Sequence, residues 1–258
     1  MGIGFQQLVS NFVRQYVTQQ DLRGFLHCHT SYSDGSNSVE ELAIACQNAG
    51  YEYLGVTDHS QAAAYAGGLR PEDLARQADE IDEVNSRLSG FRVLKGIEAD
   101  ILQDGRVDYD ERVLEQLDFV IASVHSRFNM GEKDMTTRML AAMDNPYLTI
   151  IGHPTGRLLL SRDPYPVDLD AVIGKAAETG VVLEINADPH RLDLDWRLVR
   201  QARDRGVVIS IGADAHSVSG LSYVEFGINM ARKGWLGPGD ILNTRPAGDF
   251  VAYARRRR

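Results

Sequence analysis

The strongest constraint on the fold is an alternation of apolar runs and helical patterns that repeats about every 30 residues. Seven short runs, rich in valine, isoleucine, leucine and aromatic residues, carry this repeat: Gly24–His29, Tyr53–Thr57, Phe91–Glu98, Phe119–Val124, Leu148–Gly152, Val181–Asn186 and Val207–Gly212. Runs that are apolar almost throughout are typical of parallel strands buried on both faces. The sequence therefore predicts an α/β fold, a distorted (β/α)7 barrel similar to a TIM barrel.

Helix-boundary signals lie between these runs. Ser38 and Glu41 form a capping box that predicts a helix over residues 39–49, and Pro71 suits the first turn of a helix over residues 71–88. Further helices are expected near residues 109–116, 134–143, 169–179, 195–205 and 222–233. We expect one domain over residues 21–250, after an N-terminal extension (1–20) and before a solvated basic tail (251–258) that contains Arg255–Arg258.

Composition excludes several classes of protein. Hydrophobic residues make up 43% and charged residues 24% of the 258, which is ordinary for a globular chain and unlike a disordered one. No run approaches the roughly 18 apolar residues of a membrane helix, and residues 1–20 lack the apolar core of a secretory signal. Two cysteines are too few for a disulfide framework, so the cytoplasm is the expected location. The net charge of −9 counts against a protein that coats nucleic acid.

Metal-binding residue types gather where the predicted strands end. Six of the seven histidines lie there, the third strand ends in a glutamate, and two aspartates lie in the adjoining loops. The nine candidates are His27, His29, Asp34, His59, Glu98, His125, His153, Asp214 and His216. Because the carboxyl ends of parallel strands meet at one face of a barrel, we expect these side chains to converge.

The first strand has the most informative spacing. Residues two apart on a strand point the same way, so His27 and His29 would both face the barrel mouth while Cys28 packs on the other side. Imidazoles and carboxylates together suit Zn²⁺, Mn²⁺ or Fe²⁺. Nine ligands exceed what one ion uses, so the pattern predicts a cluster of two or three divalent ions.

Several of these segments resemble the polymerase and histidinol phosphatase (PHP) domain family. The matching motifs are His27-x-His29, Thr57-Asp58-His59, Gly96-Ile97-Glu98, Ser123-Val124-His125-Ser126, Ile151-Gly152-His153-Pro154 and Asp214-Ala215-His216. Others resemble the C-terminal PHP domain of bacterial and archaeal family X DNA polymerases: Asp21–Gly24, Ala66–Leu69, Glu184–Ala187, Arg191–Leu194 and Gly234–Leu236. Only 20 residues precede the domain here, so nucleotidyl transfer is expected only if the chain is part of a longer polymerase.

The resemblance implies a trinuclear metal site and assigns its ligands. One metal would take His27, His29, Glu98 and Asp214; the second would share Glu98 and add His125 and His153; the third would take Asp34, His59 and His216. The implied activity is phosphoester hydrolysis by a metal-activated hydroxide, with Glu98, Asp214 and His125 as the central catalytic residues. Such chemistry needs mainly positioning and charge neutralisation, so no serine or cysteine nucleophile is required.

Other residues near the strand ends are candidates for substrate contacts. Arg127, Arg157, His190 and Arg191 could bind phosphate, although each could equally be surface charge. Glu184 and Asn186 alternate inward on the sixth strand and could orient ligating imidazoles. Tyr65 and Phe128 could stack a nucleobase, with packing at the rim as the simpler interpretation, and Gly67-Gly68 could form a flexible lip.

Three functions remain open. The polymerase-like motifs favour phosphoester hydrolysis at nucleic-acid 3′ ends, with frayed or single-stranded DNA as substrate, as a 3′–5′ exonuclease, 3′-phosphatase or phosphodiesterase. A small-molecule phosphomonoesterase, such as a histidinol-phosphate phosphatase, is the first alternative. A non-catalytic metal-binding interaction module is the second. An amidohydrolase fits less well, because it would need eight units and usually a carboxylated lysine at a central strand end.

Overall fold

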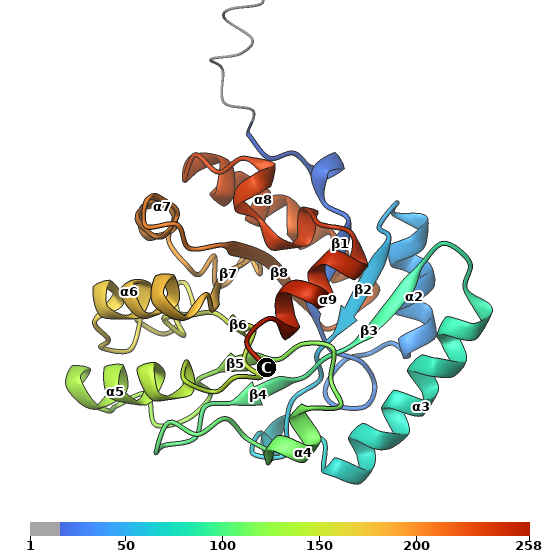
Figure 1. Cartoon of the computed structure of the whole chain (residues 1–258), viewed down its shortest axis with the longest axis horizontal. Helices are drawn as coiled ribbons and strands as arrows, with labels where there is room; N and C mark the ends of the chain where they lie inside the picture. Colours follow the sequence, from blue (N-terminus) through green and yellow to red (C-terminus); the bar gives the residue numbers. More distant parts are fainter. Residues whose placement is uncertain (1–15) are drawn as a thin grey trace, which may run out of the picture.

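The computed structural model describes residues 16–258, so most of the expected N-terminal extension lies outside the described residues. Its eight parallel strands are β1 (Gly24–Cys28), β2 (Tyr53–Val56), β3 (Arg92–Lys95), β4 (Glu98–Asp100), β5 (Ile121–Ser123), β6 (Ile150–Ile151), β7 (Val182–Asn186) and β8 (Ile209–Ala215). They form one sheet that curls at the centre of the molecule, with helices packed around it (Figure 1). The expected TIM-like barrel is confirmed.

The third predicted strand is broken in two, and this break closes the curl. The strand order is β3-β2-β1-β8-β7-β6-β5-β4, so the two strands at its ends are consecutive in the chain. Strand β3 pairs with β2, and β4 pairs with β5, with only Gly96 and Ile97 between them. The Glu98 N–H also donates to the Asp58 carbonyl at 3.0 Å. A single broken strand therefore joins the two halves of the sheet.

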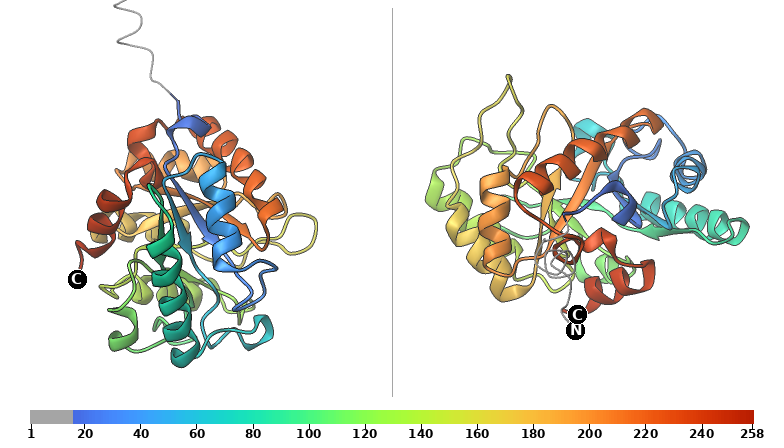
Figure 2. Two further views of the ribbon diagram at one scale, coloured as in Figure 1. Left: turned by 90° about the vertical axis from the view of Figure 1, so that its right-hand side faces the viewer. Right: turned by 90° about the horizontal axis from the view of Figure 1, so that it is seen from above.

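Seven of the principal helices follow the strands as expected and pack outside the sheet, and an eighth, at the carboxyl terminus, was not predicted (Figures 1 and 2). They are α2 (Val39–Asn48), α3 (Pro71–Arg87), α4 (Glu111–Leu114), α5 (Glu132–Ala142), α6 (Leu169–Thr179), α7 (Trp196–Asp204), α8 (Val224–Lys233) and α9 (Ala247–Arg255). Ser38 caps α2 through a complete capping box. Gly180 ends α6 in the left-handed conformation that favours glycine. Among residues 16–258, no helix has both the length and the apolar character needed to cross a membrane.

Two apolar clusters hold the fold together. The larger one lies between the sheet and the helices and includes Val17, which is fully buried four residues before the expected domain boundary. The smaller one takes inward-facing residues from six strands and their ends, among them Leu26, Phe119 and Ile150. Phe250 of α9 is fully buried against this second cluster. Helix α9 therefore closes the interior of the barrel.

The basic tail is exposed at Arg255, Arg256 and Arg258, as a solvated end would be, but it also makes specific contacts with the barrel. Arg257 donates to the carbonyls of Leu148 at 2.7 Å and Met143 at 2.6 Å, and Arg258 donates to the carbonyl of Leu117 at 2.9 Å. These acceptors lie just before strands β5 and β6. The tail therefore binds the amino-terminal edge of the barrel, and the carboxyl-terminal edge is left for the site.

Candidate metal centre

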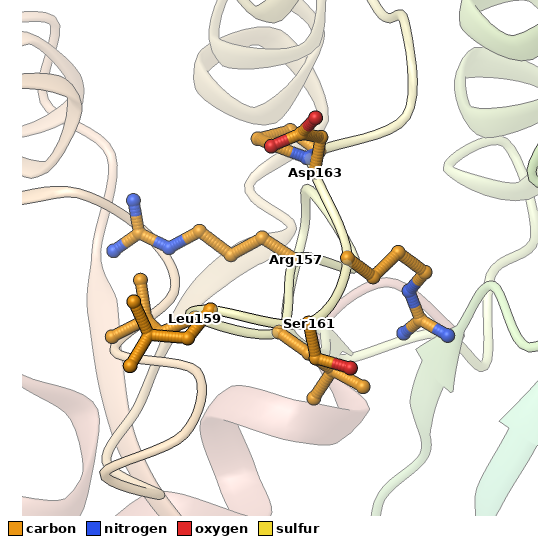
Figure 3. A pocket seen from close by; sticks show the side chains of 8 residues that line it. Arg157, Leu159, Ser161 and Asp163 are labelled. Carbon is orange, nitrogen blue, oxygen red and sulfur yellow. The ribbon is translucent and has the colours of Figure 1, made fainter.

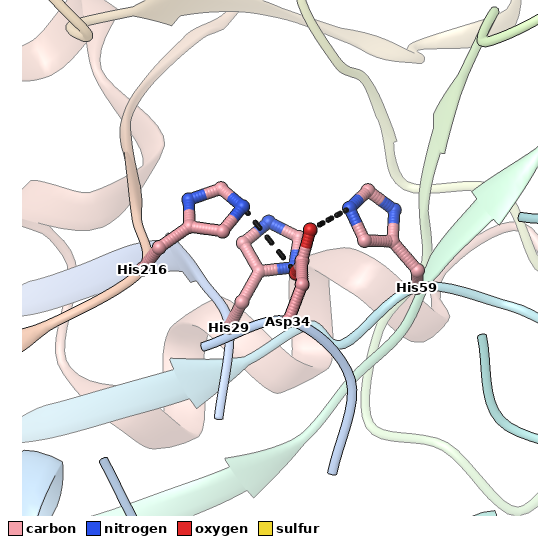
Figure 4. Close-up of side chains that lie close together, drawn as sticks. All are labelled: His29, Asp34, His59 and His216. Carbon is pink, nitrogen blue, oxygen red and sulfur yellow. Dashed lines mark ion pairs between the residues drawn. The ribbon is translucent and has the colours of Figure 1, made fainter. Parts of the chain in front are cut away.

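All nine predicted ligands converge at the carboxyl-terminal edge of the sheet. Every one of them belongs to at least one of four groups whose ligand atoms lie within 4.8 Å of one another. The groups are His29, Asp34, His59 and His216; His27, His29 and Asp214; His27, Glu98 and His153; and His59, Glu98 and His125. In the first group Asp34 lies between the rings of His59 and His216 (Figure 4). Shared members connect the groups into one cluster.

Glu98 stands at the centre of this cluster and is fully buried. Its Oε1 atom lies 3.2 Å from His27 Nε2, 3.2 Å from His125 Nε2 and 2.9 Å from His153 Nε2. Its Oε2 atom lies 3.0 Å from His59 Nδ1 and 3.7 Å from His29 Nε2. One carboxylate is thus surrounded by five imidazoles.

Asp214 forms a second anionic centre beside Glu98. Its Oδ1 atom lies 3.2 Å from His29 Nε2 and 3.7 Å from His27 Nε2. Its Oδ2 atom accepts a hydrogen bond from Asn186 Nδ2 at 3.0 Å and lies 3.1 Å from Arg191 Nε. One oxygen therefore faces the imidazoles, while the other is held by the protein.

The backbone at this edge is bent to present the ligands. His27 has a φ of 57° and Asp214 a φ of 51°, both in the region that L-residues rarely adopt, and the β1–β8 register shifts between Leu26 and Cys28. Simple alternation along β1 is therefore not what brings His27 and His29 together. The bulge does so, and the thiol of Cys28 still points away, toward the Gly55 carbonyl at 3.5 Å.

The donor set fits divalent metal ions. Among residues 16–258, seven of the fourteen buried side-chain polar atoms without a hydrogen-bond partner belong to the ligand candidates: His27 Nε2, His29 Nδ1 and Nε2, His59 Nδ1, Glu98 Oε2, His125 Nε2 and His153 Nδ1. Orphaned buried polar atoms are costly and therefore rare. Two ligands of one tetrahedral zinc ion lie about 3.3 Å apart, given metal–ligand distances of about 2.0 Å. The contacts between imidazole nitrogens and carboxylate oxygens, at 2.9–3.7 Å, have this spacing.

The carboxylates and imidazoles of the cluster favour each other's charged forms. Burial opposes ionisation of Glu98, but the imidazoles of His125, His27 and His59 hold its pKa well below the usual range. Burial likewise opposes protonation of His125, but Glu98 and Asp100 overcome it and raise its pKa to about 10. At neutral pH Glu98 is therefore ionised, as a metal ligand must be, whereas His125 would release its proton when it binds a metal.

A second layer of carboxylates orients the imidazoles. Glu184 Oε1 lies 2.6 Å from His27 Nδ1, and Glu184 Oε2 accepts a hydrogen bond from the backbone N–H of His153 at 2.7 Å. Asp100 Oδ1 lies 2.7 Å from His125 Nδ1. A partner on one ring nitrogen fixes which nitrogen is presented to a metal. Glu184 was a sequence candidate for this role and Asp100 was missed, although its position two residues after Glu98 on one strand was a usable signal.

Asp58 organises the loop that carries Asp34. It accepts hydrogen bonds from the Thr30 N–H at 2.8 Å, the Thr30 hydroxyl at 2.7 Å and Gln77 Nε2 at 2.5 Å, and also from the hydroxyl of Ser33. This fully buried carboxylate thereby holds the turn immediately before Asp34. Its sequence signal was limited to its place in the Thr57-Asp58-His59 motif.

The four cationic candidates take different places. Arg191 reaches Asp214, and its buried Nη1 atom has no hydrogen-bond partner among the described residues. Arg157 donates to the carbonyls of Arg191 at 2.9 Å and of Leu192, so it braces the loop that carries Arg191. His190 is exposed and pairs with Asp188, and Arg127 is exposed at the surface.

The loop between β6 and α6 borders the mouth of the site and projects from the molecule, drawn yellow in Figure 2. Residues 157–164 of this loop line a pocket of about 390 Å³ (Figure 3). Arg162 lies 4.1 Å above the ring of Phe128, which in turn stacks on Tyr165. Phe128 is therefore a packing residue of the rim. The pocket contains none of the nine ligand candidates, so it is separate from the ligand cluster.

Comparisons with known proteins bear on this site. A family model described as the PHP domain matches residues 26–187. The chain is 44% identical to the DNA polymerase/3′-5′ exonuclease PolX of Bacillus subtilis, over 91% of this chain and 41% of that protein. It is 32% identical to a probable phosphatase of Caldanaerobacter subterraneus, over 62% of this chain and 60% of that protein. The chain thus spans less than two thirds of the length of these curated relatives.

Solved structures share the fold. A putative histidinol phosphatase from Listeria monocytogenes superposes with a TM-score of 0.56 at 14% identity, covering 77% of this chain and 97% of that one. The histidinol phosphate phosphatase of Lactococcus lactis, solved with zinc, L-histidinol and phosphate, superposes with a TM-score of 0.55 at 15% identity, covering 81% of this chain and 93% of that one.

Proposed function

The chain belongs to the PHP domain family, and on that premise we propose that it is a metal-dependent phosphoesterase. The observation that carries the proposal is Glu98, a fully buried carboxylate surrounded by five imidazoles whose facing atoms mostly lack hydrogen-bond partners. A protein that used these residues only for stability would satisfy such atoms internally.

We propose that the cluster holds three divalent ions, of zinc, manganese or iron. Glu98 belongs to two of the four ligand groups, as a bridging carboxylate would. His27, His29 and Asp214 would hold one ion with Glu98, and His125 and His153 would hold the second. Asp34, His59 and His216, with His29 nearby, would hold the third.

The protein's own residues would position the phosphate ester. Divalent ions bound here would supply Lewis acidity and a water of lowered pKa. Glu98 and Asp214 keep the site electrically balanced, and Asp100 and Glu184 fix the imidazole orientations. The unpartnered Nη1 atom of Arg191 would bind a phosphoryl oxygen, because a guanidinium beside a cation cluster stabilises developing negative charge.

For the substrate we propose nucleic-acid 3′ ends. Support comes from 44% identity over 91% of this chain to a protein named as a 3′-5′ exonuclease. The net charge of −9 disfavours long duplex DNA, which needs many cationic phosphate contacts. A frayed or single-stranded end needs few cationic phosphate contacts, and bound metals would add positive charge at the site. We also propose a cytoplasmic location, consistent with two buried free thiols.

A small phosphomonoester is the second candidate substrate, and the relatives named as probable phosphatases favour it. The deciding experiment compares kcat/KM on a short oligonucleotide, with a 3′-phosphate or a 3′-hydroxyl end, with kcat/KM on histidinol phosphate. Both reactions use protein loaded with Mn²⁺ or Zn²⁺. We expect the oligonucleotide to be the better substrate and its cleavage to weaken with salt.

A tenfold or greater preference for histidinol phosphate, about 1.4 kcal/mol of transition-state binding, would replace the proposed substrate with the alternative. Metal binding without turnover of either substrate would favour the non-catalytic interaction module.

A further inference from the structure

An exposed tyrosine stands at the mouth of the cluster, and neither the ligand set nor the barrel core accounts for it. Tyr65 is 73% exposed, which excludes a packing role for most of its ring. Its ring centroid nevertheless lies 6.2 Å from that of His59, with an interplanar angle of 53°. A large aromatic side chain is thus held open to solvent directly beside the proposed metal ligands.

The segment that carries Tyr65 is rigidly built. It forms a short 3-10 turn, Ala64–Ala66, that follows the fully buried Ala63. After the turn, the Leu69 N–H donates to the His59 carbonyl at 2.8 Å, which fastens the segment beside a ligand. At Gly68 an added Cβ would stand 1.9 Å from the Ser60 carbonyl oxygen, so only glycine permits this close approach. These contacts place the segment beside His59; the flexible lip expected at Gly67-Gly68 stays a prediction.

The ring of Tyr65 is uncharged and adjoins the ligand cluster through His59. A tyrosine hydroxyl is neutral at physiological pH, because the ordinary pKa of a phenol is about 10. A neutral aromatic face thus stands beside the ligand cluster, an arrangement that suits a nucleotide better than a small inorganic ester.

We propose that Tyr65 is the base-binding residue of this site, and that its ring stacks on the base of the terminal nucleotide whose phosphate enters the cluster. The inference rests on the proposed function. Stacking on an aromatic ring tolerates every base, because each base has a π face. The site would then select nucleic-acid ends without selecting sequence, and Tyr65 would separate such substrates from phosphomonoesters that lack a base.

The test uses two single-stranded oligonucleotides that differ only in the last residue. One ends in an ordinary nucleotide and the other in an abasic residue. Both carry the same 3′ group, phosphate or hydroxyl, whichever the wild type processes. We expect the wild type to prefer the ordinary end by about tenfold or more in kcat/KM. Tyr65→Ala should abolish this preference by raising KM on the ordinary end alone, and Tyr65→Phe should retain it.

Phe226→Ala is the matched control, because Phe226 is 44% exposed on the outer helix α8. It should leave both substrates unaffected. If Tyr65→Ala lowered kcat/KM equally on both oligonucleotides, or on neither, the proposed role of Tyr65 would be overturned. Equal kcat/KM of the wild type on the ordinary and the abasic oligonucleotide would also overturn the role of Tyr65, but it would leave the proposed function intact. A wild type that turns over histidinol phosphate but neither oligonucleotide would overturn the proposed substrate, and the base-binding role with it.

Discussion

Replacing Glu98 by glutamine is the most informative single perturbation of the site. The substitution keeps the size and one oxygen of the side chain but removes the negative charge that faces five imidazoles at 2.9–3.7 Å. Unit charges about 4 Å apart interact by about 4 kcal/mol at an effective dielectric constant of 20. Since about 1.4 kcal/mol is a factor of ten, the affinity for each ion that Glu98 contacts should fall about a thousandfold.

The assay has three readouts: metal content by elemental analysis, thermal melting, and kcat on the preferred phosphoester. Glu98→Gln should lose at least two ions and lower kcat by about a thousandfold or more. It should still melt cooperatively, because the interior cluster around Leu26 and Phe119 is separate from the site. Asp34→Asn is the matched control: Asp34 belongs to one ligand group, so this variant should lose a single ion. Wild-type metal content together with wild-type kcat in Glu98→Gln would refute the bridging role.

Three further predictions concern other parts of the molecule. Burial raises the pKa of Asp193 to about 6, compared with about 4 in the unfolded chain. Ionisation of Asp193 therefore lowers the free energy of unfolding progressively between these two pH values, fully above about pH 6 and not below about pH 4. Asp193→Asn should therefore increase the free energy of unfolding at pH 8 by up to about 3 kcal/mol, and an equal gain in denaturant melts near pH 4 would contradict the assignment. Arg191→Ala should lower kcat/KM about a hundredfold with metal content unchanged, and loss of metal instead would make Arg191 a structural residue. Phe250→Ala should cost about 3–5 kcal/mol in chemical denaturation, and a loss under 1 kcal/mol would mean that α9 does not close the barrel.

The sequence was sufficient for most of the fold because local signals and tertiary packing agree. Apolar runs became strands within a few residues, and Ser38 caps its helix as expected. The break at Gly96 and Ile97 was not predictable, because it follows from a change of pairing partner from β2 to β5. Helix α9 was missed because its place depends on the burial of Phe250 in an interior built by distant strands.

The candidate site shows the same division. The convergence of the nine ligand candidates was predictable, because the direction of a parallel strand fixes the edge at which its last residues lie. The roles of the arginines in the loops could not be predicted. Arg157 and Arg191 both follow strands in the sequence, yet one binds backbone carbonyls and the other reaches Asp214. That choice depends on how two loops pack together, which single-sequence patterns do not encode.

The most direct test of the account is the metal stoichiometry of the chain purified without chelator. Elemental analysis should find two to three transition-metal ions per chain, bound by the cluster around Glu98. Chelation should abolish phosphoester hydrolysis, and added Mn²⁺ or Zn²⁺ should restore it. A stoichiometry well below one, with no gain in metal or activity after reconstitution, would contradict the metal cluster and the function proposed from it.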